Sequence, residues 1–293
     1  MAYGTPDGID DIERYYTDIR HGRPPTPELL RELTDRYRAI GGRSPLLEIT
    51  RMQAKGLQER LEGTAVYIGQ KHSSPSIPNA IAQMQHDGVS EAVGLVLAPH
   101  YSAMSVGDYA RRARAASDEL GWGGRLTMVK SWHLEPGYIS LLADRVRAAI
   151  GSLPEPAGDP LVVFTAHSLP ERILQENDPY PEQLRATAEA VASKAALAEW
   201  RIGWQSAGRT TDPWLGPDVL EVVEQEAENG TRAIVVCPCG FVADHLEVLY
   251  DLDIEAAAEA ASRGIAFTRT QAPNDDPGFL DVLANVVVRA FDI

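Results

Sequence analysis

The stretch Val162-Val-Phe-Thr-Ala-His-Ser-Leu-Pro-Glu171 decides the fold class of this chain. Residues 161–165 are apolar or β-branched and carry no charge, which is typical of a strand buried on both faces of a parallel sheet. The strand pattern stops at residue 166, and Pro170 suits the first turn of a following helix. Ligands of open α/β sheets bind beyond the carboxyl ends of the strands. His167 therefore lies where such a fold keeps its chemistry, although a histidine that only caps a turn fits this stretch equally well.

A second segment repeats this design. Residues 233–238, Ala-Ile-Val-Val-Cys-Pro, predict another buried strand, and an acidic helix is expected to follow it. Glu247, Asp251 and Glu255 are spaced four residues apart, so they form one stripe of carboxylates on that helix. Like charges at this spacing cost a few tenths of a kcal/mol per pair, and a cation along the stripe would remove the cost. The alternatives are a solvated acidic face and, for Glu247 alone, a capping box that begins at Asp244.

Buried strands alternate with amphipathic helices along the whole chain, which predicts parallel sheets with right-handed crossovers. Strands are expected at residues 65–69, 92–98, 126–131, 161–166, 199–204, 233–238 and 264–269. Helices are expected at residues 10–20, 26–40, 49–61, 77–87, 106–120, 135–150, 181–198, 219–230, 246–262 and 278–291. The proline-rich segment 154–160 is the best candidate for a linker between two halves.

Two long motifs, Thr165-Ala-His-Ser-Leu-Pro170 and Gly240-Phe-Val-Ala-Asp-His-Leu-Glu-Val-Leu-Tyr-Asp251, resemble the ferrochelatases, lyases that insert ferrous iron into a porphyrin in haem biosynthesis. The similarity runs the length of the chain. The opening Met1-Ala-Tyr-Gly-Thr-Pro6 is closest to the Gram-positive-type members, which act on coproporphyrin III rather than protoporphyrin IX. Shorter matching segments lie at residues 12–20, 41–46, 97–101, 203–206 and 212–217.

The resemblance implies an α/β architecture of two Rossmann-like domains with parallel sheets that face a cleft. The expected boundaries are residues 1–150 for the N-terminal domain and 151–272 for the C-terminal domain. Residues 273–293 are expected to form a C-terminal helix that crosses back to the first domain. Family members normally carry apolar residues before the opening motif, which form the first central strand. We therefore expect either a start assigned too late or a first sheet that lacks most of this strand.

Composition and charge restrict the function. Apolar residues make up 44% and charged residues 24% of the 293-residue chain, which is ordinary for a globular protein. No apolar run approaches the roughly 18 residues of a membrane span, and residues 1–8 lack signal-peptide features, so a cytoplasmic location is expected. The net charge of −15 argues against nucleic acid or an anionic membrane as partner. It also repels a porphyrin with four propionates, so binding requires a local cluster of donors.

His167 and Glu247 are the expected catalytic residues and metal ligands. Metallation requires that two pyrrole N–H protons go to a base and that hydrated iron exchanges water for other ligands. A histidine has an unperturbed pKa near 6.5, so a neutral imidazole can accept a proton or coordinate iron. Facing each other across a cleft, His167 and Glu247 could take one proton each, or one could deliver metal while the other removes protons.

Further ligands follow from the resemblance. Asp251 and Glu255 match family positions near the active site where a magnesium-like ion can bind, and oxygen ligands suit such a cation. A solvated helix face is the alternative. Tyr3 matches a tyrosine that lies near the metal on the opposite porphyrin face, and a phenolate can ligate haem iron. Tyr3 is thus expected both as metal ligand and as substrate contact.

The resemblance also implies a set of propionate-binding donors: Arg20, Arg36, Ser44, Gln53 and Tyr109, together with Tyr3. Lys71 and His72 are expected to line the cleft in an undefined role. Cys237 and Cys239 are half the number needed for the cluster that some ferrochelatases carry, so no iron–sulfur cluster is expected and two inert thiols are predicted.

The expected substrates are ferrous iron and a porphyrin, with haem as product. A monomer is expected, with transient contacts to neighbouring haem-pathway enzymes. Four other readings remain open: a protoporphyrin IX ferrochelatase that makes protohaem, a non-catalytic haem-binding protein on the same fold, a cobalt chelatase, and a serine hydrolase. The last is the weakest, because no Gly-x-Ser-x-Gly elbow is present.

Overall fold

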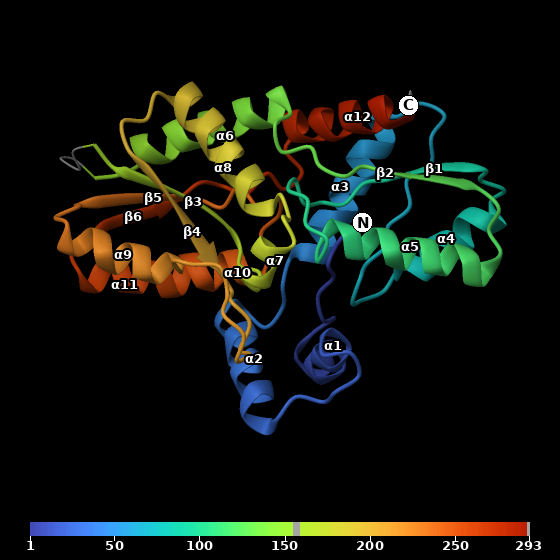
Figure 1. Ribbon diagram of the computed structural model, residues 1–293, viewed down its shortest axis with the longest axis horizontal. Helices are drawn as coiled ribbons and strands as arrows, with labels where there is room; N and C mark the ends of the chain where they lie inside the picture. The colour runs from blue at the N-terminus through green and yellow to red at the C-terminus, as the bar shows by residue number, and fades with distance from the viewer. Residues whose placement is uncertain (155–158, 292–293) are drawn as a thin grey trace.

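Two parallel sheets lie side by side and are joined by helices (Figure 1). The structure, a computed structural model, describes residues 1–154 and 159–291. The larger sheet has the strand order β4-β3-β5-β6, and all its neighbours run parallel. Its strands are β3 (Leu161–His167), β4 (Trp200–Gln205), β5 (Ala233–Cys237) and β6 (Ala266–Arg269). The smaller sheet pairs β1 (Glu91–Gly94) with β2 (Arg125–Met128).

The predicted central strand is confirmed in β3. Residues 161–166 are all buried, and successive side chains enter two different cores. Val162 and Phe164 join the core beneath α6 (Pro136–Gly151) and α8 (Tyr180–Ala195). Leu161 and Val163 join the core on the opposite face, which is covered by α9 (Val219–Glu228), η2 (Asp251–Ala256) and α11 (Ala257–Ser262). Both sheet faces are therefore closed, as the uncharged sequence predicts.

The predicted helix over residues 246–262 is interrupted. It begins as α10 (Leu246–Leu249), passes through the π-helical segment η2 and continues as α11. The backbone N–H of Glu255 donates to Tyr250, five residues earlier, which is the hydrogen-bond spacing of a π-helix. The prediction of one regular α-helix was wrong here, and the irregular segment is the one that carries Asp251 and Glu255.

The smaller sheet is shorter than predicted. Residues 65–69 form no strand, and only Met1 and Ala2 lie between residues 69–71 and 95–97. The amino group of Met1 donates to Leu95, and Ala2 exchanges backbone hydrogen bonds with Gly69 and Lys71. The strand prediction for 65–69 is wrong because the isolated bridges here are made by the next residue, Gln70, which pairs with Ala2 and with Ser76. An apolar cavity of about 440 Å³ lies beside Met1 in this half.

Helices cover both faces of the smaller sheet. One core contains residues of α4 (Ile77–His86) and α5 (Val106–Leu120), and α12 (Pro277–Phe291) contacts β1, β2 and α3 (Leu46–Arg60). The last helix thus returns to the first half, as expected. It also packs on α6, which itself contacts α8 and β5 of the larger sheet. One core consequently runs from Leu57 through Tyr138 and Phe164 to Phe279.

A helical arm projects from this body (Figure 1). It consists of η1 (Ile9–Asp11), α1 (Ile12–Ile19) and α2 (Pro27–Ala39). Buried Ile12 and Tyr37 pack with Leu246 of α10, so the base of the arm is anchored to the second half. The remaining element, α7 (Arg172–Gln175), follows β3.

The domain boundaries at residues 150 and 272 stay a prediction. Of the predicted linker 154–160, residues 155–158 lie outside the described residues. Within residues 1–154 and 159–291, no helix is both long and apolar enough to cross a bilayer.

Candidate functional site

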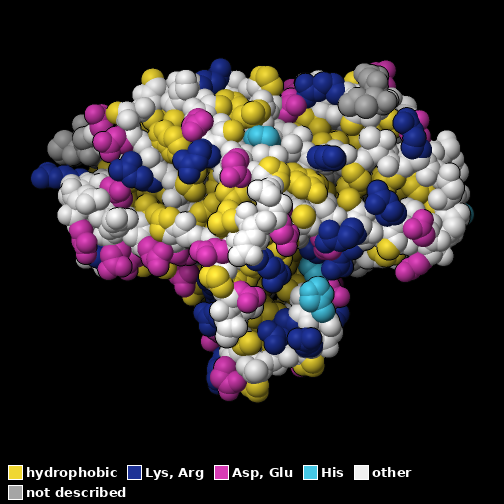
Figure 2. All heavy atoms as spheres, in the orientation of Figure 1, with side chains coloured by type: hydrophobic (Ala, Val, Ile, Leu, Met, Phe, Trp, Pro, Cys, Tyr) yellow, Lys and Arg dark blue, Asp and Glu magenta, His cyan; other side chains and the backbone are white. Residues whose placement is uncertain are grey.

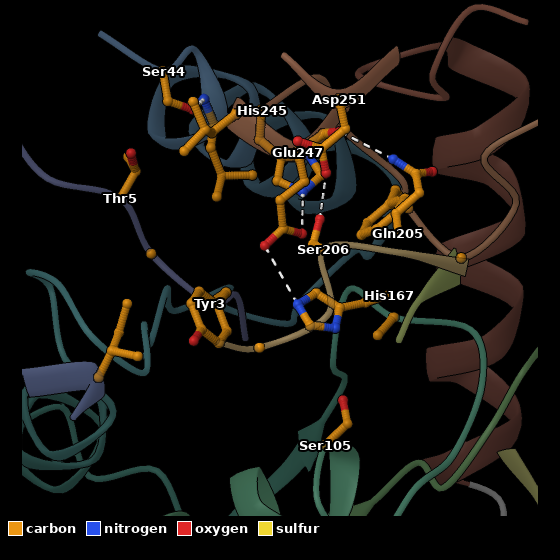
Figure 3. A pocket seen from close by; sticks show the side chains of 18 of the residues that line it. Tyr3, Thr5, Ser44, Ser105, His167, Gln205, Ser206, His245, Glu247 and Asp251 are labelled. Carbon is orange, nitrogen blue, oxygen red and sulfur yellow. Dashed lines mark hydrogen bonds and ion pairs between the residues drawn. The ribbon is translucent and has the colours of Figure 1, made fainter. Parts of the chain in front are cut away.

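A cavity of about 640 Å³ opens between the two halves and the arm. Its size falls within the range of small-molecule sites. The first half and the arm contribute Tyr3, Thr5, Arg36, Ser44 and Tyr109 to its lining, and the second half contributes His167, Ser206, His245, Glu247 and Asp251 (Figure 3). The predicted catalytic residues and most predicted binding residues therefore meet in one place.

His167 ends β3 and points its ring toward Glu247 (Figure 3). Its Nδ1 lies 2.5 Å from the carbonyl oxygen of Ser168. A carbonyl can only accept, so Nδ1 carries the proton and Nε2 of the neutral ring presents its lone pair. Nε2 lies 3.5 Å from Oε1 of Glu247. The hydroxyl of Tyr180 donates to the His167 carbonyl at 3.0 Å and helps to fix the end of the strand.

Glu247 lies between two imidazoles. Its Oε1 faces His167, and its Oε2 lies 3.2 Å from Nε2 of His245. Nδ1 of His245 donates to the Ala243 carbonyl at 2.9 Å, so Nε2 of the neutral ring is again an acceptor. Two acceptors approach each other favourably only when they share a proton. The group His167–Glu247–His245 therefore has two positions at which a proton can be held.

The electrostatics favour an ionised Glu247. Burial alone would raise its pKa. When the two rings are protonated, the charge of His167 and the hydrogen bond donated by His245 outweigh burial. Together with the charge of Arg36 they hold the pKa of Glu247 well below its usual range. Burial lowers the pKa of His245, but Glu247 more than compensates, so the pKa of His245 is raised. The pair therefore favours a carboxylate with a proton on the neighbouring ring.

Sequence reasoning missed His245. Residues two positions apart on a helix do not face each other, so the spacing of His245 and Glu247 did not predict a contact between them. The structure brings them together because His245 is the extended residue before α10, with φ −159° and ψ −176°. The pattern Asp244-His245-Leu246-Glu247 at the start of a helix was the available signal.

Both His167 and Glu247 come from the second half. The expectation that they face each other across a cleft was wrong, because the end of β3 and the start of α10 lie side by side. Glu247 is held there by its backbone carbonyl, which accepts a hydrogen bond from Gln205 Nε2 at 3.0 Å. Gln205 Oε1 in turn accepts from the hydroxyl of Thr165 at 2.6 Å. The carboxyl ends of β3 and β4 thus position the proposed reactive pair.

The cation along the carboxylate stripe is Arg36. Its Nη2 lies 3.0 Å from Oδ1 of Asp251 and 3.1 Å from Oε2 of Glu255. Its guanidinium also lies 4.5 Å from the ring centroid of Tyr250. Oδ2 of Asp251 accepts a hydrogen bond from Ser206 at 2.5 Å. A guanidinium therefore stands where a magnesium ion was expected at Asp251 and Glu255, and the donor set in this arrangement does not fit a second cation.

Among residues 1–154 and 159–291, no three His, Cys, Asp or Glu side chains are arranged so that they could together hold a metal ion, and this includes the group at Glu247. Burial raises the pKa of Cys237 to about 12 and that of Cys239 well above its usual value. Both thiols are therefore protonated at neutral pH.

Replacing Arg36 by Gln should destabilise the protein more at pH 8 than at pH 5. Burial raises the pKa of Asp251 to about 6, although Arg36 and Ser206 lower it. The pKa of this carboxyl is higher in the folded protein than its value of about 3.9 in the unfolded chain. Its contribution to the free energy of unfolding is therefore largest at low pH and is lost as the pH rises through the folded pKa. Without Arg36 that pKa rises further. We expect a loss of about 2 kcal/mol in the free energy of unfolding at pH 8 and less than about 1 kcal/mol at pH 5.

Urea denaturation at both pH values measures this difference. Arg38→Gln is the matched control, because Arg38 pairs with Asp35 on the exposed face of the same helix and should change stability by less than about 0.5 kcal/mol. Equal losses for Arg36→Gln at pH 5 and pH 8 would contradict the assignment of Asp251 as the affected group.

Tyr3, Tyr109 and Lys71 form one wall of the cavity. Nζ of Lys71 lies 5.7 Å from the Tyr3 ring centroid and 5.5 Å from that of Tyr109, and it binds Oδ2 of Asp108 at 2.6 Å. The surrounding protein, followed by the charge of Glu247, raises the pKa of Tyr3. The Tyr3 phenol is thus neutral before any metal arrives.

The other predicted residues differ in their placement. Ser44 is buried in the lining, and its Oγ accepts from the backbone of Leu46 at 3.3 Å. Gln53 also lines the cavity, but its amide nitrogen already donates to the carbonyls of Val242 and Asn274. Its N–H groups are therefore engaged in joining the halves rather than free for a propionate.

Arg20 and His72 lie outside the cavity lining. Arg20 Nε donates to the carbonyl of Arg23 on the arm. Nδ1 of His72 lies 2.5 Å from Asp18, and burial lowers the pKa of His72 to about 4 despite that contact. Of the two residues predicted as possible cleft lining, only Lys71 faces the cavity.

Comparison with known proteins gives a consistent match. The family model described as Ferrochelatase matches residues 1–291. The protein named coproporphyrin III ferrochelatase from Geobacillus kaustophilus (strain HTA426) is 49% identical, over 99% of this chain and 94% of its own length. Its namesake from Bacillus subtilis (strain 168) is 47% identical, over 99% of this chain and 96% of its own length.

Solved structures support the architecture alone. SirB from Bacillus subtilis with Fe3+ superposes with a TM-score of 0.60 at 14% identity, covering 83% of this chain and 88% of that one. The sirohydrochlorin chelatase SirB from Bacillus subtilis subspecies spizizenii, in complex with cobalt, gives a TM-score of 0.63 at 12% identity, covering 84% and 89%. The two-sheet fold described above is thus shared with chelatases.

Proposed function

Because this chain belongs to the ferrochelatase family, we propose that it inserts ferrous iron into coproporphyrin III to give the iron complex, coproheme, in haem biosynthesis. The observation that carries the proposal is the proton-accepting group His167–Glu247–His245 in the wall of a cavity of about 640 Å³. The substrate assignment follows the names of relatives that match nearly the full chain.

The proposed chemistry begins with deprotonation. Two pyrrole N–H protons must leave before iron can occupy the centre of the ring. Nε2 of His167 and Oε1 of Glu247 are adjacent acceptors. The second carboxylate oxygen contacts Nε2 of His245, so a proton taken by Glu247 can be shared onward when the His245 ring is neutral. General-base groups of this kind contribute about 10²–10⁴ to a rate. Two acceptors side by side match a reaction that releases two protons.

The same side chains can receive iron. Imidazole nitrogen and carboxylate oxygen are suitable donors for ferrous iron, which must exchange water for protein ligands before it enters the macrocycle. Tyr3 lines the same cavity as this pair and remains our proposed ligand on the other porphyrin face. The sequence motifs suggested these roles, and the shared cavity supports them.

An anaerobic metallation assay tests the proposal. Purified protein is mixed with ferrous iron and metal-free coproporphyrin III, and in parallel with protoporphyrin IX, while the absorption spectrum is followed. We expect coproporphyrin III to be metallated at least about tenfold faster in kcat/KM, and mixtures without protein to show background insertion only.

Three outcomes have separate meanings. A preference for protoporphyrin IX would replace the substrate while leaving the reaction in place. Tight haem binding without metallation of either porphyrin would favour the non-catalytic alternative. Metallation at the background rate with no porphyrin binding would contradict the proposed function itself.

A further inference from the structure

Basic side chains are few near the cavity, and those present are already paired. Figure 2 shows acidic side chains along the edge formed by α9 and α11, whereas basic ones gather on the arm and where it meets the body. In the described part of the chain, the lysines and arginines that line the cavity are Arg36, Lys71 and Arg209. A tetracarboxylate must take its charged anchors from such groups, and this requires at least one of them to exchange its partner.

Arg36 and Lys71 are poorly placed for exchange. Arg36 is 25% exposed, binds two carboxylates and stacks on Tyr250. Lys71 is 12% exposed, lies between two tyrosine rings and binds Asp108. Removing either cation from its partners would leave a carboxylate in a partly buried position without its charge partner, which is costly.

Arg209 is placed differently. Its side chain is 64% exposed, and its Nη1 and Nη2 contact the two carboxylate oxygens of Glu32 on α2. Both residues line the cavity. A guanidinium binds any carboxylate in this two-pronged manner, and an exposed pair of this kind contributes little to stability. Exchange of Glu32 for another carboxylate therefore conserves the contacts of Arg209 at small cost.

Glu32 also has an alternative environment. It is one turn before Arg36 on α2, so the arm meets the second half through three ion pairs. Arg36 provides the cation in two of them, and Glu32 provides the anion in the third. The Arg36 pairs can hold the arm while Glu32 turns out to solvent, where a carboxylate is well hydrated. After the exchange Arg209 still faces one carboxylate, so its charge stays paired.

We infer that Arg209 is a carboxylate anchor for the porphyrin and that Glu32 occupies it until a propionate takes its place. The inference rests on the proposed function, since it assigns a specificity residue to the same site. Glu32 then acts as an intramolecular competitor. It keeps Arg209 oriented in the free protein, and it weakens substrate binding by the free energy of the Glu32–Arg209 ion pair, which must break when the substrate binds.

A double-mutant cycle tests this. Binding of metal-free coproporphyrin III, without iron, is measured by porphyrin fluorescence for the wild type, Arg209→Ala, Glu32→Gln and the double variant. Arg209→Ala should weaken binding about tenfold, because one charge-assisted carboxylate contact is lost. Glu32→Gln should tighten binding about threefold in the wild-type background and have no effect in the Arg209→Ala background.

Arg172→Ala is the matched control. Arg172 is an exposed arginine at the start of α7, and it pairs with Asp212, three residues after Arg209. It lies outside the cavity lining, so its loss should leave the dissociation constant for the porphyrin unchanged. Thermal melting of each variant checks that the fold is retained. Arg209→Lys should bind with intermediate affinity, since charge is kept and the two-pronged geometry is lost.

Anchoring predicts that the two single variants change porphyrin affinity in opposite directions. An ion pair that only holds the arm in place predicts the same direction for both. If Glu32→Gln weakened binding as Arg209→Ala does, the pair would only hold the arm, and the inference would be wrong. Unchanged affinity for Arg209→Ala, in a wild type that binds and metallates coproporphyrin III, would sink the anchor and leave the proposed function standing. A wild type that does not bind coproporphyrin III would overturn both.

Discussion

Replacing His167 by Ala should lower the turnover number for iron insertion by about 10² or more. Nε2 of this ring lies 3.5 Å from Oε1 of Glu247, and the Nδ1 contact with the Ser168 carbonyl sets the orientation of the ring. Alanine removes both the proton acceptor and the nitrogen ligand for incoming iron. The dissociation constant for metal-free porphyrin should change little, because propionate anchors lie elsewhere in the cavity.

The measurement is anaerobic turnover with saturating iron, together with porphyrin affinity by fluorescence. His86→Ala is a matched control, because His86 is an exposed histidine in the last turn of α4 and should leave turnover within twofold of wild type, roughly the scatter of such assays. A His167→Ala variant that kept more than about a third of wild-type turnover would remove this residue from the chemistry.

Replacing Glu247 by Gln should also lower turnover by about 10² or more, and should lower the pKa of His245. Glutamine has nearly the same shape, so the packing of α10 is kept while the negative charge is lost. Glu247 raises the pKa of His245 through a hydrogen bond and through its charge. Without the charge, the burial of His245 dominates, and the ring becomes harder to protonate.

The second effect can be measured without any substrate, by NMR titration of the His245 ring in wild type and variant. Glu259→Gln is the control, because Glu259 lies further along the same helical segment and pairs with Arg263 at the surface. Its turnover and the His245 titration should both match wild type. Near-normal turnover in Glu247→Gln would argue that the carboxylate only supports the site; an unchanged His245 titration would contradict the hydrogen-bonded pair.

The sequence predicted the larger sheet better than the smaller one, for a physical reason. Residues 161–166 and 233–237 are buried on both faces, so an uncharged apolar run identifies each strand unambiguously. Residues 65–69 have a similar composition, but a strand also needs partners on the ladder. The bridges here reach only the next residue, Gln70, from Ala2 and Ser76. Strand formation at that point depends on distant residues, which no local pattern reports.

The candidate site divides in the same way. The spacing of Glu247, Asp251 and Glu255 predicted a carboxylate stripe that attracts a cation, and the structure supplies one. That cation comes from Arg36, 215 positions from Asp251, and periodicity cannot detect such a contact. His245 was hidden because its approach to Glu247 depends on one extended residue at a helix start. Residue types were readable from the sequence, whereas their partners required the fold.

The core that runs from Leu57 to Phe279 restricts how a flat, rigid ligand can enter. Buried apolar contacts cross from one half to the other, and α12 packs on helices of both, so the halves cannot swing apart on a hinge without exposing that core. A ligand must therefore enter through the opening between the two halves and the arm, with side chains at its rim moving aside. Covalent cross-links between the two halves should accordingly leave porphyrin binding intact. A covalent link between α2 and the loop at Arg209 should instead stop the porphyrin from entering.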